Sequence, residues 1–84
     1  MFDVKVKRDA QTIATGKTNG PVIDEDGTGE ICVFDLQGVV PSGFLTLVLT
    51  DSRGGDAQVF EGCQASTWAN GEATFLYIEP ERAP

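Results

Sequence analysis

The segment from Asp26 to Leu49 constrains the fold of this chain more than any other part of it. The segment begins with an acidic, glycine-containing turn and continues into an apolar stretch. After the corner at Pro41-Ser-Gly43, leucines occupy alternate positions, at 45, 47 and 49. Because successive side chains of a strand point to opposite faces, this spacing predicts a strand with one fully apolar face. The segment therefore predicts two strands, joined by turns, that contribute to one core.

Short strands are expected along the rest of the chain, separated by turn-forming residues. They are predicted at 2–8, 11–15, 30–36, 44–50, 56–61, 63–69 and 72–78, with an apolar pair at 22–23 and a turn cluster at 16–20. Asn70-Gly71 predicts a tight hairpin, because both residues tolerate a positive φ. Strands at this spacing indicate a sandwich or a barrel. We predict an all-β fold, a small antiparallel Ig-like or prealbumin-like sandwich of about seven short strands.

The chain of 84 residues is the size of one small domain. We predict that residues 1–79 form a single domain and that residues 80–84 are a Pro-rich C-terminal tail, because proline lacks the N–H group that a further strand pairing would need. A core of this size leaves little room for a deep pocket. Any function is therefore expected to use the surface.

The charge balance limits the classes of function. There are 6 Lys and Arg against 13 Asp and Glu, which gives a net charge of −7, and there is no histidine. The shortage of cations argues against direct nucleic-acid binding, which relies on clustered Lys and Arg. The absence of histidine removes the usual general base near neutral pH and the commonest metal ligand. We predict a protein that is not an enzyme and that has no cofactor.

No stretch of the sequence is apolar over the roughly 18 residues of a membrane span, so no membrane partner is expected. The N-terminal residues alternate between polar and apolar and lack the apolar region of a secretory signal. We expect synthesis in a cytoplasm, with incorporation into a virion as an option. Cys32 and Cys63 are expected to be reduced there. A disulfide between them stays open as the alternative, because cysteines on two strands of a small sandwich could face each other.

Three of the expected strands, 30–36, 44–50 and 72–78, carry apolar residues on both faces. A sheet with one solvated face normally alternates between apolar and polar residues. The second apolar face is explained either by scattered surface residues, which are normal, or by a patch that contacts a partner. The candidate partner-binding residues are Phe34, Phe44, Val48, Trp68 and Tyr77.

The acidic loop is the only candidate metal site. Its carboxylates belong to Asp24, Glu25, Asp26 and Glu30. Clustered carboxylates in a glycine-bent loop could supply several of the oxygen ligands that calcium needs. The spacing is not that of an EF-hand, and a solvated acidic hairpin turn explains it better. We predict no metal site, and calcium binding stays open as an alternative.

The run Asp26-x-x-Gly29-x-Ile31-x-Val33-x-x-Leu36, followed by Pro41-x-Gly43-x-Leu45-x-Leu47-x-Leu49, resembles the carboxypeptidase-regulatory-like and Cna-B-like family of prealbumin-type sandwiches. The resemblance covers residues 24–50. Leu45 stands where that family usually has an aromatic residue, and residues 37–40 look like an insertion before the corner. The resemblance implies a sandwich fold and a structural, tethering or binding role.

Together these observations predict a non-enzymatic structural protein–protein interaction module. The predicted setting is an accessory or decoration subunit of a larger assembly, such as a viral capsid, bound to a protein partner or to further copies of itself. The first alternative is a small acidic inhibitor of the anti-defence type, which mimics nucleic acid and blocks a basic groove. The second alternative is a calcium-dependent adhesion module.

Overall fold

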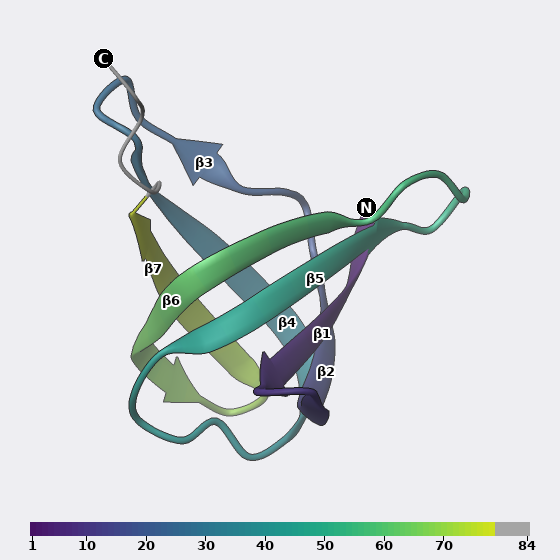
Figure 1. Ribbon diagram of the computed structural model, residues 1–84. Coiled ribbons are helices and arrows are strands. Elements are labelled where there is room, and N and C mark those ends of the chain that lie inside the picture. Colours follow the sequence, from purple (N-terminus) through teal and green to yellow (C-terminus); the bar gives the residue numbers. More distant parts are fainter. Residues whose placement is uncertain (79–84) are drawn as a thin grey trace.

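The computed structural model describes residues 1–78, which form seven strands and no helix (Figure 1). The strands are β1 (Phe2–Arg8), β2 (Gln11–Thr18), β3 (Val22–Ile23), β4 (Thr28–Gly38), β5 (Leu45–Asp51), β6 (Gln58–Ala69) and β7 (Glu72–Ile78). The predicted tail at 80–84 lies outside the described residues.

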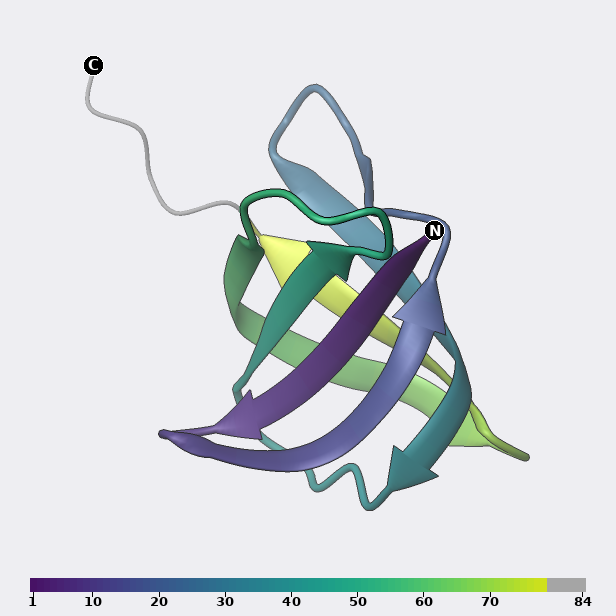
Figure 2. The same cartoon turned by 90° about the vertical axis from the view of Figure 1, so that its right-hand side faces the viewer.

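The strands form one sheet that closes on itself. Their hydrogen-bonded order is β2-β1-β5-β6-β7-β4-β3, and β2 also pairs with β4. This pairing closes six antiparallel strands into a barrel, while β3 extends the sheet at one edge of β4 (Figure 2). The structure is all-β as predicted, but the Ig-like or prealbumin-like sandwich was wrong. A sandwich has two separate sheets, whereas here one sheet wraps around the core.

The seam between β2 and β4 explains why the barrel closes. At Gly16, an added Cβ would lie 2.5 Å from Val33 Cγ1 and 2.9 Å from the carbonyl oxygen of Phe34. Only glycine permits so close an approach of the two backbones. The pairing register also shifts next to Gly16, opposite Asp35, which has a positive φ of 54°. Bulges of this kind bend a strand and increase its twist. The predicted strand at 11–15 was therefore too short, because residues 16–18, which were expected to be part of a turn cluster, continue β2.

The core is made of inward side chains from the six barrel strands and from the β4–β5 loop. It consists of Val4, Val6, Ala14, Ile31, Val33, Val40, Leu45, Leu47, Leu49, Cys63, Ala73, Phe75 and Tyr77. The predicted leucine face is confirmed, since all three leucines of β5 are buried. Tyr77 packs edge-to-face against Phe60, with ring centroids 5.1 Å apart.

The two C-terminal hairpins partly follow the prediction. The segments 56–61 and 63–69 were expected to be separate strands, but they form the single strand β6. Gly62, with a φ of 73°, lies where β6 changes partner from β5 to β7. The tight turn at Asn70-Gly71 is confirmed, with φ values of 55° and 79°. These angles fit a two-residue turn of the primed type, which matches the twist of the strands.

Candidate binding surfaces

The acidic loop between β3 and β4 is held in shape by its own hydrogen bonds. The backbone N–H of Asp24 donates to the carbonyl of Thr28 at 2.7 Å, and the N–H of Gly27 donates to the carbonyl of Asp24 at 3.0 Å. The Asp26 carboxylate accepts bonds from the hydroxyl and the backbone N–H of Thr28, at 2.6 and 3.0 Å. These two bonds lower the pKa of Asp26. One of the predicted acidic residues therefore stabilises the loop from within.

The carboxylates of the acidic loop do not converge on a point. Within residues 1–78, no three side chains of Asp, Glu or Cys come close enough together to hold a metal ion. Asp24, Glu25 and Asp26 are exposed in the loop, whereas Glu30 projects from the outer face of β4. Glu30 lies between Val22 and Leu76, its partners in the sheet pairing. Glu30 also lines one shallow hollow together with Asp24 of the loop, so the acidic loop adjoins this strand surface.

An apolar patch surrounds Glu30 on the outer face of β3 and β7. We define the β7 face as Val22, Leu76 and Ile78, whose side chains are 70%, 44% and 71% exposed. Val22 and Leu76 flank Glu30 in one cross-strand row, and Ile78 is paired with Thr28 in the next row on that face. Directly opposed residues of an antiparallel pair point to the same side, so these three side chains share one surface. The β7 face is therefore one outer surface, on which the charged Glu30 lies between Val22 and Leu76.

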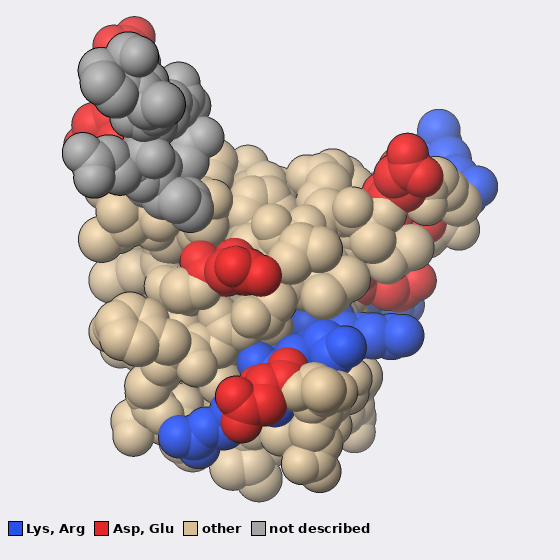
Figure 3. Space-filling model, viewed as in Figure 1, with Lys and Arg blue, Asp and Glu red and all other residues tan. Residues whose placement is uncertain are grey.

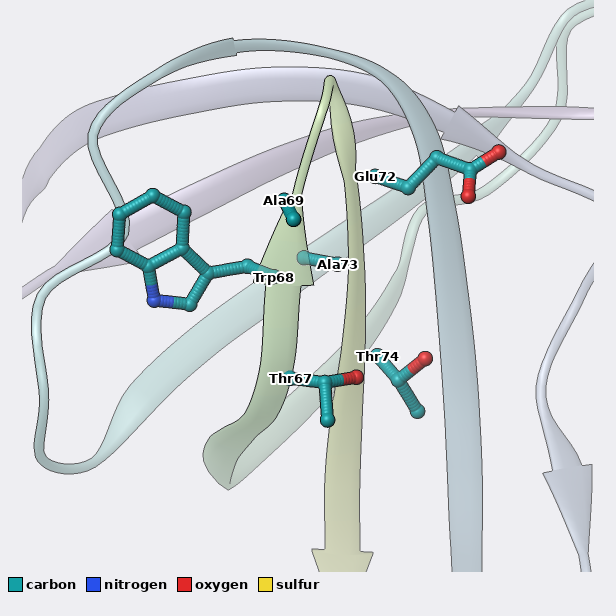
Figure 4. Close-up of a pocket in the computed structure, with 6 residues that line it drawn as sticks. All are labelled: Thr67, Trp68, Ala69, Glu72, Ala73 and Thr74. Carbon is teal, nitrogen blue, oxygen red and sulfur yellow. The ribbon is translucent and has the colours of Figure 1, made fainter.

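A second group of exposed apolar side chains lies at one end of the barrel, where the β4–β5 loop and the β6–β7 hairpin emerge. We define the rim as Val39, Phe44 and Trp68. Trp68 is paired with Ala73 near the hairpin tip, and its indole stays exposed. Figure 4 shows the indole projecting from one side of the hairpin and Glu72 from the other, around a shallow hollow. The candidates Phe44 and Trp68 are therefore both on the surface. Phe44 lies in the β4–β5 loop, and Trp68 lies near the end of β6.

The other three candidate partner-binding residues are less accessible. Phe34 and Val48 are half-buried on the outer side of β4 and β5, respectively. Tyr77 is buried in the core, where it packs against Phe60. The structure thus does not gather the five predicted residues on one surface. Sequence reasoning found both faces of 72–78 apolar and selected Tyr77, whereas the exposed face of that strand is the one with Leu76 and Ile78.

The two cysteines point to opposite sides of the barrel wall and are both free thiols. Cys32 is exposed on the outer face of β4, with its Sγ 3.7 Å from the Thr74 hydroxyl. Cys63 is fully buried and its Sγ donates to the carbonyl of Phe60 at 3.4 Å. Burial raises the pKa of the Cys63 thiol to about 11. The alternative of a disulfide between them does not occur in this structure.

Comparison of the chain with protein-family models, with curated proteins and with solved structures found no match. The prealbumin-type resemblance therefore stays a prediction, although the sandwich that it implied is replaced by a barrel. Residues 1–78 contain no helix that is long and apolar enough to cross a membrane. The function has to be argued from the surfaces themselves.

Proposed function

We propose that this chain is a non-enzymatic protein–protein interaction module that works as an accessory subunit of a larger assembly. The observation that carries the proposal is the β7 face. Val22 on β3 and Leu76 and Ile78 on β7 lie on the outside of the barrel, on either side of Glu30 on β4. Exposed apolar side chains that gather on one surface mark contact sites in soluble proteins.

The strand pairing makes the β7 face a rigid surface. Val22 lies on β3, which is held to β4 at residues 29 and 30, and β4 is in turn paired with β7 from Thr28 to Val33. A rigid surface loses little conformational entropy when a partner binds, so more of the hydrophobic gain remains as affinity. Full burial of one such side chain contributes about 1.5–3 kcal/mol. These side chains are already partly buried, so each contributes less than this, and polar contacts around them have to supply the rest of the affinity.

The alternative of an acidic inhibitor has one supporting observation, which is the ordered acidic loop. A mimic of nucleic acid needs carboxylates that are presented to a basic groove. Asp24, Glu25, Asp26 and Glu30 are all exposed, and Asp26 accepts both bonds from Thr28 through Oδ1 alone. We place the apolar contact first, because exposed carboxylates are ordinary on a protein surface whereas gathered exposed apolar side chains are not. The setting of a capsid stays a prediction from the sequence.

The test compares native masses of the assembly that contains this chain. The double variant Leu76→Asp and Ile78→Asp puts two charges into the β7 face, and the expected result is the free chain in place of the complex. Val39→Asp is the matched control, because Val39 is equally exposed but lies at the rim. Far-UV circular dichroism of each variant checks that the barrel is intact.

Two results would refute this proposal. The first is a wild-type chain that is a free monomer when isolated from its source under native conditions. The second is a double variant that stays in the complex to the same extent as Val39→Asp. Loss of binding on neutralising Asp24 and Glu25, with no effect of the double variant, would support the inhibitor instead.

A further inference from the structure

The cations of this acidic chain are concentrated on one hairpin. Four of the six Lys and Arg residues, namely Lys5, Lys7, Arg8 and Lys17, belong to β1 and β2. None of these four has an ion-pair partner among residues 1–78. In Figure 3, Lys and Arg form a band across the lower half of the surface, broken by acidic atoms, and most of the surface above the band is uncharged.

One of these lysines, Lys5, lies next to an apolar side chain on a neighbouring strand, and a second, Lys7, lies next to a threonine. The pairing places Lys5 beside Val48 and Val48 beside Val59, while Lys7 lies beside Thr46. Their side chains point outward, because the residues that alternate with them, such as Val6 and Leu47, are buried. Val59 is 55% exposed and Val48 is half-buried. We define the β1 face as Lys5, Lys7, Val48 and Val59.

The lysines of the β1 face lie on the wall of the barrel opposite the β7 face. Around the closed sheet the strands follow each other in the order β1, β2, β4, β7, β6 and β5. Three steps in either direction separate β1 from β7. Val59 lies between them, at the start of β6, whose second half pairs with β7. Variants at Lys5 and variants at Leu76 and Ile78 therefore change separate surfaces.

We infer that the β1 face binds a carboxylate-rich, partly apolar segment of a partner protein. The unpaired ammonium groups of Lys5 and Lys7 attract carboxylates, and Val48 with Val59 gives apolar side chains a place to pack. The inference names the chemistry of a partner for a surface that the proposed function does not use. It makes the barrel a bridge between two partners.

The surroundings of the β1 face favour a short protein segment over a nucleic acid. Asp3 lies on β1 beside Lys17, and Glu61 is exposed on β6 close to the other end of the face. A phosphate backbone carries charge at every step, so it would meet these carboxylates along its path. The net charge of −7 also repels a long polyanion. A short segment with apolar residues among its acidic ones needs to meet only the two lysines and the valines, so fewer of its charges face Asp3 and Glu61 than those of a polynucleotide would.

The test uses a short fluorescent peptide in which Glu alternates with Val, and measures its anisotropy with the full chain at rising salt. We expect binding to the wild type that weakens as salt screens the charges. Lys5→Glu should raise Kd about tenfold, since it removes an attraction and adds a repulsion. Val59→Ser should raise Kd about threefold through lost apolar contact. A second peptide with Ser in place of Val should bind more weakly than the first.

Arg53→Glu is the matched control, because it lies in the β5–β6 loop and lowers the net charge by two, from −7 to −9, as Lys5→Glu does. We expect it to bind the peptide almost as the wild type does. Equal weakening by the two variants would overturn the inference, because net charge alone would then explain binding. A wild-type chain that does not bind the peptide would also overturn it. A single-stranded DNA oligonucleotide that binds more tightly than the peptide would show that the ligand class is wrong.

Discussion

The two strands that flank β1, namely β2 and β5, contribute to the interior in opposite ways. The inward positions of β2 and β5 are Ala14, Gly16 and Thr18 in the first strand, and Leu45, Leu47 and Leu49 in the second. β5 supplies volume to the core. β2 gives up volume, so that its backbone reaches β4 and closes the sheet. Small barrels fit their narrow interiors with such combinations of small and large residues. Closure of this barrel therefore depends on the small residues of β2 at the seam as much as on the large residues of β5 that fill the core.

The largest effect is expected at Gly16. Gly16→Val places atoms against Val33 and against the carbonyl of Phe34, which an added Cβ already approaches to 2.9 Å. Because a backbone carbonyl cannot turn aside as a side chain can, β2 has to move away from β4. We expect a loss of about 3–4 kcal/mol in the free energy of unfolding, measured by urea denaturation. Gly16→Ala should lose less but change in the same direction.

Thr15→Val is the control for the Gly16 variants, since Thr15 is exposed on the same strand. Its free energy of unfolding should change by less than about 0.5 kcal/mol. If Gly16→Ala and Gly16→Val were both as stable as the wild type, the close contact at the seam would not be what holds the barrel shut.

The second largest effect is expected at Leu47, which is fully buried at the middle of β5. Leu47→Ala removes apolar contacts and leaves a cavity, which costs about 3 kcal/mol. Val48→Ala, one residue away on the outer face, should cost less than about 1 kcal/mol. Equal losses for the two variants, measured by the same urea denaturation, would mean that the inner and outer faces of β5 are packed alike. The inward leucines would then not be the part of β5 that distinguishes it from β2.

The sequence predicts β5 well and β2 poorly, and the reason is physical. Alternating leucines are a direct signature of a strand with one buried face. Gly16 and Thr18 carry no such apolar signal, and they stand next to residues that form turns. Their role depends on β4, a dozen or more residues away in the chain. Whether the sheet forms a sandwich or a barrel depends on the pairing of β2 with β4. The periodicity of apolar residues along one strand does not predict which distant strand pairs with it.

The same limit applies to the candidate surfaces. The pattern of 72–78 predicts apolar residues on both faces without deciding which face is buried, and the structure exposes Leu76 and Ile78 and buries Tyr77. Val22 joins them only because β3 pairs with β4. Trp68 and Tyr77 looked alike in the sequence as aromatic residues on paired strands, yet one is exposed and the other buried. The position of each along the barrel axis, rather than its residue type, decides this.

The smallest of the three effects is a difference between two glycines with similar backbone strain. Gly38 at the seam has a φ of 112°, and Gly54 in the β5–β6 loop has a φ of 96°. An added Cβ at Gly38 would lie 2.5 Å from the carbonyl oxygen of Ile13, whereas at Gly54 it would meet nothing within 4 Å. Both alanine variants should lose about 1 kcal/mol because alanine disfavours a positive φ. The free energy of unfolding of Gly38→Ala should fall by about 1–2 kcal/mol more, because the added Cβ forces β2 and β4 apart. Equal urea midpoints for the two variants would show that backbone strain alone, and not the close approach of the strands, selects glycine at the seam.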